Sequence, residues 1–68
     1  MNVILHSTGC PKCKVLKLKL DKKNIVYTEN HDIDIEAMKN RGFMSMPILQ
    51  VDDEYMDFTS ANNWINQQ

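Results

Sequence analysis

The two cysteines, Cys10 and Cys13, are the residues of this sequence best suited to chemistry. They are spaced C-x-x-C, and they lie where the apolar run of residues 3–5 gives way to a helical pattern. At a helix start, unpaired backbone N–H groups and the positive end of the helix dipole favour thiolate over thiol. They can lower the pKa of a cysteine from about 8.5 to roughly 3.5–7.5. The spacing therefore predicts dithiol–disulfide exchange.

Cys13 is expected to lie on the buried face of the helix that begins at this motif. Cys13, Leu16 and Leu20 recur at intervals of three and four residues, and Val15 and Leu18 are expected to widen this apolar stripe. Cys10 lies at the tip of the helix, where its sulfur is exposed. A substrate can reach the exposed sulfur first, so Cys10 is predicted to attack and Cys13 to resolve the mixed disulfide.

Length and composition indicate one small domain that spans residues 1–68. The hydrophobic content of 43% is ordinary for a globular protein, and no apolar run approaches the roughly 20 residues of a membrane span. Residues 1–6 lack the length and the basic start of a signal peptide. We therefore expect a cytoplasmic protein. In that compartment structural disulfides are rare, and C-x-x-C is typical of redox or metal chemistry.

Hydrophobic patterning predicts an α/β fold in the order βαβ-α-ββα. The expected strands span residues 2–6, 25–29, 48–51 and 55–58. The first expected helix spans residues 11–22 and is capped by Ser7 or Thr8. The second spans residues 34–40, with Ile35 and Met38 pointing inward. The last helix is expected to be capped by Thr59 or Ser60, and its inward residues are Ala61, Trp64 and Ile65.

These elements should form a four-stranded mixed sheet flanked by helices. The first two strands are expected to be parallel, because a helix connects them by a crossover. Pro47 lacks an N–H and is expected at the start of the third strand. Cys10 would then lie at the carboxyl end of the first strand, where such sheets bind ligands.

Two segments resemble the glutaredoxin family of the thioredoxin fold. Residues 7–13, Ser-Thr-Gly-Cys-Pro-Lys-Cys, are similar to its active-site loop, and residues 42–48, Gly-Phe-Met-Ser-Met-Pro-Ile, are similar to the segment that ends in its cis-proline. The resemblance covers essentially the whole chain. It implies that Cys10 is the nucleophile and Cys13 the resolving cysteine, in a loop that includes Pro11 and Lys12. It also implies that Pro47 is cis and that the substrate is bound by Met46, Pro47 and Thr59.

The chain departs from glutathione-using glutaredoxins at two places. Lys12 stands where they usually have an aromatic residue, and Met56-Asp57 stands where they have a Gly-Gly pair. Residues 42–47 and 55–58 also resemble NrdH-type redoxins, which take electrons from thioredoxin reductase and pass them to ribonucleotide reductase. The resemblance implies a monomer without bound cofactor or metal, reduced by glutathione or thioredoxin reductase, with ribonucleotide reductase as one candidate protein substrate.

Two other readings of the same residues remain open. The first is a zinc site formed by His6, Cys10, Cys13 and His31, although their spacing is not that of known zinc motifs. The second is a non-catalytic module that presents a sheet edge and an adaptable loop around Met44 to a protein partner.

Charge is distributed unevenly along the chain. Residues 1–27 carry six lysines and one acid, a net charge of +5, and residues 28–68 carry eight acids and two basic residues, a net charge of −6. The six lysines form either a solvated helix face or a positive field that attracts an acidic partner to Cys10. They are not interleaved with aromatic residues, and nucleic-acid binding is not expected.

Overall fold

The computed structural model describes residues 2–43 and 46–68 of the chain. These residues form β1 (Val3–His6), α1 (Pro11–Lys22), β2 (Thr28–Asn30), α2 (Ile35–Asn40), β3 (Ile48–Val51), β4 (Glu54–Met56) and α3 (Phe58–Asn66). The strands form one sheet in the order β2-β1-β3-β4. β1 is parallel to β2 and antiparallel to β3, which is antiparallel to β4. The predicted element order and mixed sheet are confirmed.

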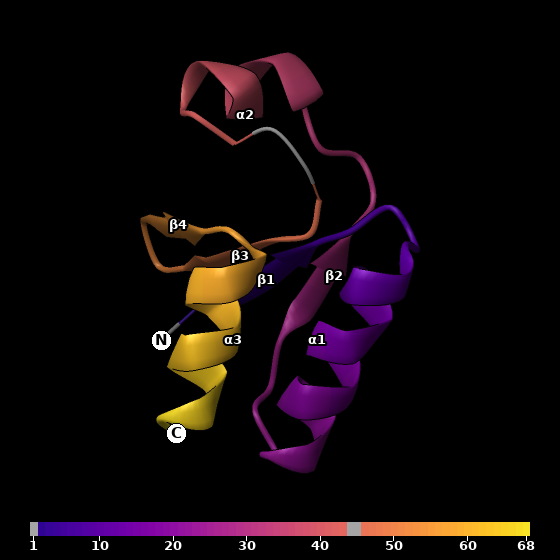
Figure 1. Ribbon diagram of the computed structural model, residues 1–68, viewed down its shortest axis with the longest axis vertical. Coiled ribbons are helices and arrows are strands. Elements are labelled where there is room, and N and C mark those ends of the chain that lie inside the picture. The colour runs from indigo at the N-terminus through magenta and orange to yellow at the C-terminus, as the bar shows by residue number, and fades with distance from the viewer. Residues whose placement is uncertain (1, 44–45) are drawn as a thin grey trace.

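α1 and α3 lie side by side on one face of the sheet, and the core lies between them and β1 and β3 (Figure 1). Alternate strand residues point into this core. Its fully buried side chains include Leu5, Leu16, Leu20, Leu49 and Ile65. α2 stands apart, at the end of the molecule opposite the C-terminal ends of α1 and α3 (Figure 1). In the described part of the chain, no helix is long or apolar enough to cross a membrane.

α1 has a narrower buried face than the sequence pattern predicts. Leu16 and Leu20 are fully buried, but Val15 is 40% exposed and Leu18 is 69% exposed. Leu18 is two residues from both buried leucines, and at about 100° per residue it points to the opposite side of the helix. The expectation that Val15 and Leu18 widen the buried stripe is therefore wrong.

The second strand begins later than predicted. Asn24, which follows the C-cap Lys23 of α1, has a positive φ of 58°, and the N–H of Ile25 then bonds to the carbonyl of Leu20. This bond belongs to the helix end, so the chain joins the sheet only at Thr28. Val26, predicted to lie in the strand, is 90% exposed.

α2 and α3 both begin at an aspartate. Asp34 caps α2, and Asp57 caps α3 by accepting a 2.8 Å hydrogen bond from the N–H of Ser60. The prediction of Thr59 or Ser60 as the α3 cap is wrong, because β4 ends at Met56 and the helix starts at once. In α2, Met38 is buried as expected, but Ile35, also expected inward, is 54% exposed.

Candidate active site

The redox motif lies in the loop that joins β1 to α1. Ser7 continues from the strand end and is fully buried, and Gly9 turns the backbone with a φ of +80° that side chains other than glycine rarely adopt. Cys10 is the N-cap of α1, in place of the expected Ser7 or Thr8, and Pro11 is the first helical residue. The loop therefore brings Cys10 to the helix start, where the N–H groups are unpaired.

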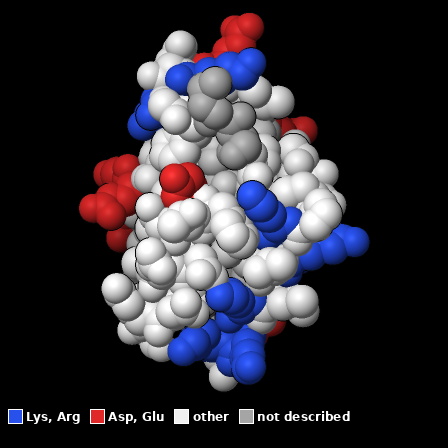
Figure 2. All heavy atoms as spheres, in the orientation of Figure 1, with Lys and Arg blue, Asp and Glu red and all other residues white. Residues whose placement is uncertain are grey.

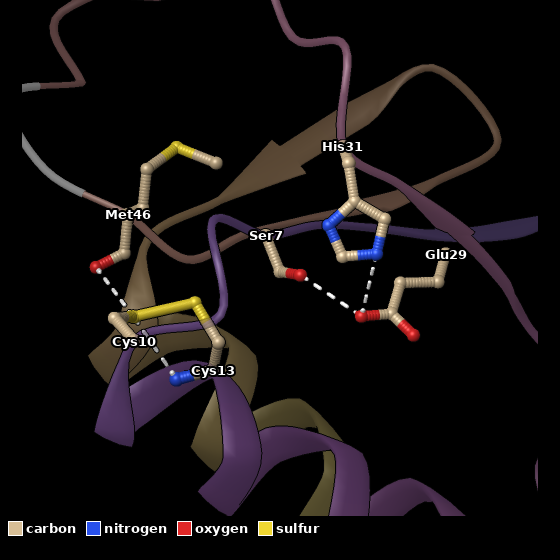
Figure 3. Close-up of a disulfide and its surroundings, with 6 residues drawn as sticks. All are labelled: Ser7, Cys10, Cys13, Glu29, His31 and Met46. Carbon is tan, nitrogen blue, oxygen red and sulfur yellow. Dashed lines mark hydrogen bonds and ion pairs between the residues drawn. A yellow bond between two sulfur atoms is a disulfide. The ribbon is translucent and has the colours of Figure 1, made fainter.

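Cys10 and Cys13 form a disulfide, with their Cα atoms 5.1 Å apart (Figure 3). The backbone N–H of Cys13 donates to Cys10 Sγ at 3.2 Å. Cys10 is partly exposed, whereas Cys13 is only 1% exposed and belongs to the buried face of α1. This geometry directs one sulfur of the pair to solvent and gives it a hydrogen-bond donor.

The segment before β3 meets the disulfide from the other side. The Met46–Pro47 peptide bond is cis, as the resemblance implies, and Pro47 is fully buried. The carbonyl oxygen of Met46 lies 3.9 Å from Cys10 Sγ (Figure 3). Polar backbone of Met46 thus lies beside the partly exposed sulfur of Cys10. Met44, expected in an adaptable contact loop, lies outside the described residues.

The start of α3 also borders the active-site loop. The Lys12 ammonium lies 5.4 Å from the centre of the Phe58 ring, a cation–π contact that joins the loop to α3. Thr59 follows Phe58 in the first turn of this helix and is exposed. Lys12 and the beginning of α3 thus lie together at one side of the disulfide.

A polar cluster under the loop was not foreseen from the sequence. Glu29 accepts a 3.0 Å hydrogen bond from the Ser7 hydroxyl, and the same carboxylate oxygen lies 3.1 Å from His31 Nε2 (Figure 3). Its other oxygen forms an ion pair with Lys17 at 3.0 Å. The hydrogen bond from Lys17 is the main cause that lowers the pKa of Glu29, and the Ser7 hydroxyl contributes. The same contact raises the pKa of Lys17. Glu29 therefore carries a charge that its neighbours stabilise.

His6 belongs to a separate buried network on the sheet. Its Nε2 lies 2.9 Å from Gln50 Oε1 and its Nδ1 lies 3.0 Å from Asn30 Nδ2. The Gln50 amide nitrogen donates to the Asp52 carbonyl, so its oxygen faces the ring and His6 donates from Nε2. In residues 2–43 and 46–68 no three potential metal ligands are grouped together. The suggested zinc ligands His6 and His31 thus face other partners than the cysteines.

Comparison of the sequence with protein-family models and with curated proteins finds no match. Among solved structures, the chain is similar to NrdH-redoxin from Escherichia coli, described as a glutaredoxin-like protein with a thioredoxin-like activity profile. The TM-score is 0.78 at 17% sequence identity, and the match covers 98% of this chain and 93% of that one. The chain therefore has the thioredoxin-like fold, in the small form seen in this glutaredoxin-like redoxin.

Proposed function

We propose that the protein is a small thiol–disulfide oxidoreductase that reduces disulfides of proteins or small molecules. The observation that carries the proposal is the contrast between the paired sulfurs. Cys10 is partly exposed at the N-cap of α1, with a backbone donor on its sulfur, whereas Cys13 is buried behind it. A pair built only to staple the fold has no need of one accessible sulfur beside a helix start.

The exchange proceeds in two balanced steps. The Cys10 thiolate attacks one substrate sulfur, so that a Cys10–substrate bond forms, the substrate disulfide breaks and the leaving thiolate takes up a proton. Cys13 then loses its proton and attacks the Cys10 sulfur, which expels the second substrate thiolate. Two electrons pass from the protein to the substrate, and the protein returns to the Cys10–Cys13 disulfide seen here. The Met46 backbone and Thr59 are proposed to hold the substrate beside Cys10.

Single-cysteine variants test these roles. Cys13→Ser should accumulate a mixed disulfide with a protein substrate through Cys10, because the resolving thiol is missing. Cys10→Ser should lose the exchange almost completely, since Cys13 is buried. Mass spectrometry of acid-quenched mixtures measures how much mixed disulfide and how much reduced substrate each variant forms. If the two variants reacted equally, the assignment of nucleophile and resolving cysteine would be wrong.

We propose further that thioredoxin reductase, and not glutathione, reduces the oxidised protein. Support comes from the thioredoxin-like activity profile described for the similar NrdH-redoxin. It also comes from the replacement of the Gly-Gly pair by Met56-Asp57, because Asp57 is here committed to capping α3. Ribonucleotide reductase is then the candidate protein substrate that the NrdH-type resemblance supplies.

Coupled oxidation of NADPH distinguishes the reductants. Turnover of a small disulfide should occur with thioredoxin reductase and be absent with glutathione plus glutathione reductase. Turnover in the glutathione arm alone would contradict the proposed reductant but keep the oxidoreductase. Silence in both arms, together with inert single-cysteine variants, would favour a non-catalytic binding module.

A further inference from the structure

The lysines of α1 and of its C-cap, Lys23, differ in what their side chains contact. Four have partners: Lys12 lies over the Phe58 ring, Lys17 pairs with Glu29, Lys19 bonds to Asn62, and Lys23 donates to the Gln68 carbonyl. Lys14 and Lys22 are exposed and have no ion pair or hydrogen bond within the described part of the chain. Two charges of this helix are thus available to a partner.

These two lysines share the outer side of α1 with its exposed apolar residues. Helical spacing aligns Pro11, Lys14, Val15, Leu18 and Lys22, which we call the α1 ridge. All five are exposed, and Leu18 is 69% exposed. Beside Leu18, an open hollow of about 250 Å³ is lined by Lys14, Lys17, Leu18 and Asp21. The ridge therefore offers an apolar centre with positive charge around it.

The ridge is continuous with the redox site. It begins at Pro11, the residue after Cys10, and reaches Leu18 after a helical rise of about 10 Å. Figure 2 shows that basic side chains gather over the part of the molecule where α1 lies, whereas acidic ones gather on the opposite side, near the turn between β3 and β4. A partner whose disulfide is at Cys10 would extend over this positive, partly apolar surface.

We propose that the α1 ridge docks protein substrates that carry acidic side chains and one apolar side chain beside their disulfide. The proposal rests on the oxidoreductase function and defines its substrate class. Charge complementarity selects the acidic substrate, because Asp21 is the one acid among the six lysines of residues 12–23. The apolar centre at Val15 and Leu18 fits a protein surface better than a nucleic-acid backbone, whose contacts are mainly with Lys and Arg.

Single-turnover exchange with designed peptides tests the docking without any reductase. The reduced protein is mixed with one of two disulfide peptides of equal length, both with a leucine beside the disulfide. The acidic peptide also carries several glutamates there, and the neutral peptide carries glutamines at the same positions. Hydroxyethyl disulfide serves as an uncharged substrate that is too small to reach from Cys10 to Leu18. At low ionic strength the acidic peptide should react about tenfold faster than the neutral one, and the difference should vanish at about 0.5 M salt.

The chain supplies charge-matched control variants. Lys14→Gln and Lys22→Gln should each slow the acidic peptide by about two- to fivefold and leave the neutral peptide unchanged. Lys19→Gln and Lys23→Gln remove the same charge from side chains with partners inside the molecule, and should have less than half that effect. Leu18→Ser should slow both peptides but not hydroxyethyl disulfide, whereas Ile35→Ser, at an exposed apolar residue of α2, should slow neither.

The outcomes separate this inference from the function on which it rests. Equal rates for the two peptides, or equal losses from Lys14→Gln and Lys19→Gln, would overturn the docking proposal while exchange itself continues. Binding of single-stranded DNA that depends on Lys14 and Lys22, without a preference for the acidic peptide, would also overturn it. Absence of exchange with every substrate, hydroxyethyl disulfide included, would overturn the oxidoreductase function.

Discussion

Glu29 connects the two segments that hold the disulfide. Ser7 stands at the start of the active-site loop, and Lys17 lies one helical turn beyond Cys13 on α1. The Glu29 carboxylate bonds to both, and also to His31 in the loop that follows β2. A buried hydroxyl such as that of Ser7 needs a hydrogen-bond partner, and Glu29 supplies it. The charged side chain of Glu29, on β2, thus links the active-site loop to α1.

Stability should depend on pH through Glu29. Its pKa is lowered in the folded protein, chiefly by Lys17, so the stabilisation is complete above the ordinary value of about 4.5 and is lost as the pH falls through the lower folded value. Glu29→Gln cannot titrate there. Urea unfolding across a pH series should show the largest difference between wild type and variant near neutral pH, and a shrinking difference below about pH 4.5.

Glu54→Gln is the control for this experiment. Glu54 is exposed and forms no ion pair with any described residue, so its variant should follow the wild-type pH profile. A difference between wild type and Glu29→Gln that stayed constant from neutral to acidic pH would mean that the Glu29 carboxylate does not stabilise the fold through its charge.

At the scale of elements, the sequence predicts those features that depend on neighbouring residues in the chain. The C-x-x-C spacing predicted the redox motif, and hydrophobic patterning, together with Pro11 at a helix start and Pro47 before a strand, predicted the element order. The Glu29 cluster was not predicted, because the pattern of residues 25–29 indicates a strand but not its register in the sheet. Only the observed register, with Glu29 opposite Leu5, brings that carboxylate beneath the loop.

The cap of α3 shows the same limit. Asp57, Thr59 and Ser60 are all suitable caps by residue type, and the choice among them depends on where β4 releases the chain. That point is set by the pairing of Met56 with Leu49 across the β3–β4 hairpin, which residue type at positions 57–60 does not reveal. Tertiary pairing therefore decides a boundary that composition leaves open.

Asp57→Ala should destabilise the protein by about 1 kcal/mol, because it removes the hydrogen bond to the Ser60 N–H at the start of α3. Ser60→Ala keeps that backbone donor and should change stability by less than about 0.5 kcal/mol. Thermal unfolding followed by circular dichroism measures both. Equal losses for the two variants would show that Ser60 contributes to the cap through its side chain.

At the scale of the whole molecule, the protein combines a small core with a surface on which basic and acidic residues lie on different sides. A chain of 68 residues buries a limited apolar area, so each core leucine is a large part of its stability. α1 contributes to both features. Its inner face completes the core with Leu16 and Leu20, and its outer side carries the exposed lysines and Leu18. The same helix thus supports the fold and provides the surface proposed to receive substrates.

Leucine-to-alanine changes on the two sides of α1 should separate these roles. Leu16→Ala creates a cavity in the core and should cost about 2–5 kcal/mol, a large share of the roughly 5–15 kcal/mol that stabilises a typical domain. Leu18→Ala makes the same chemical change at a side chain that is 69% exposed, and should change the free energy of unfolding by no more than about 0.5 kcal/mol. Urea denaturation of the oxidised proteins, followed by Trp64 fluorescence, measures both values. Similar losses for the two variants would mean that Leu18 is packed inside the folded protein, and a residue needed there could not serve as the apolar centre of a docking surface.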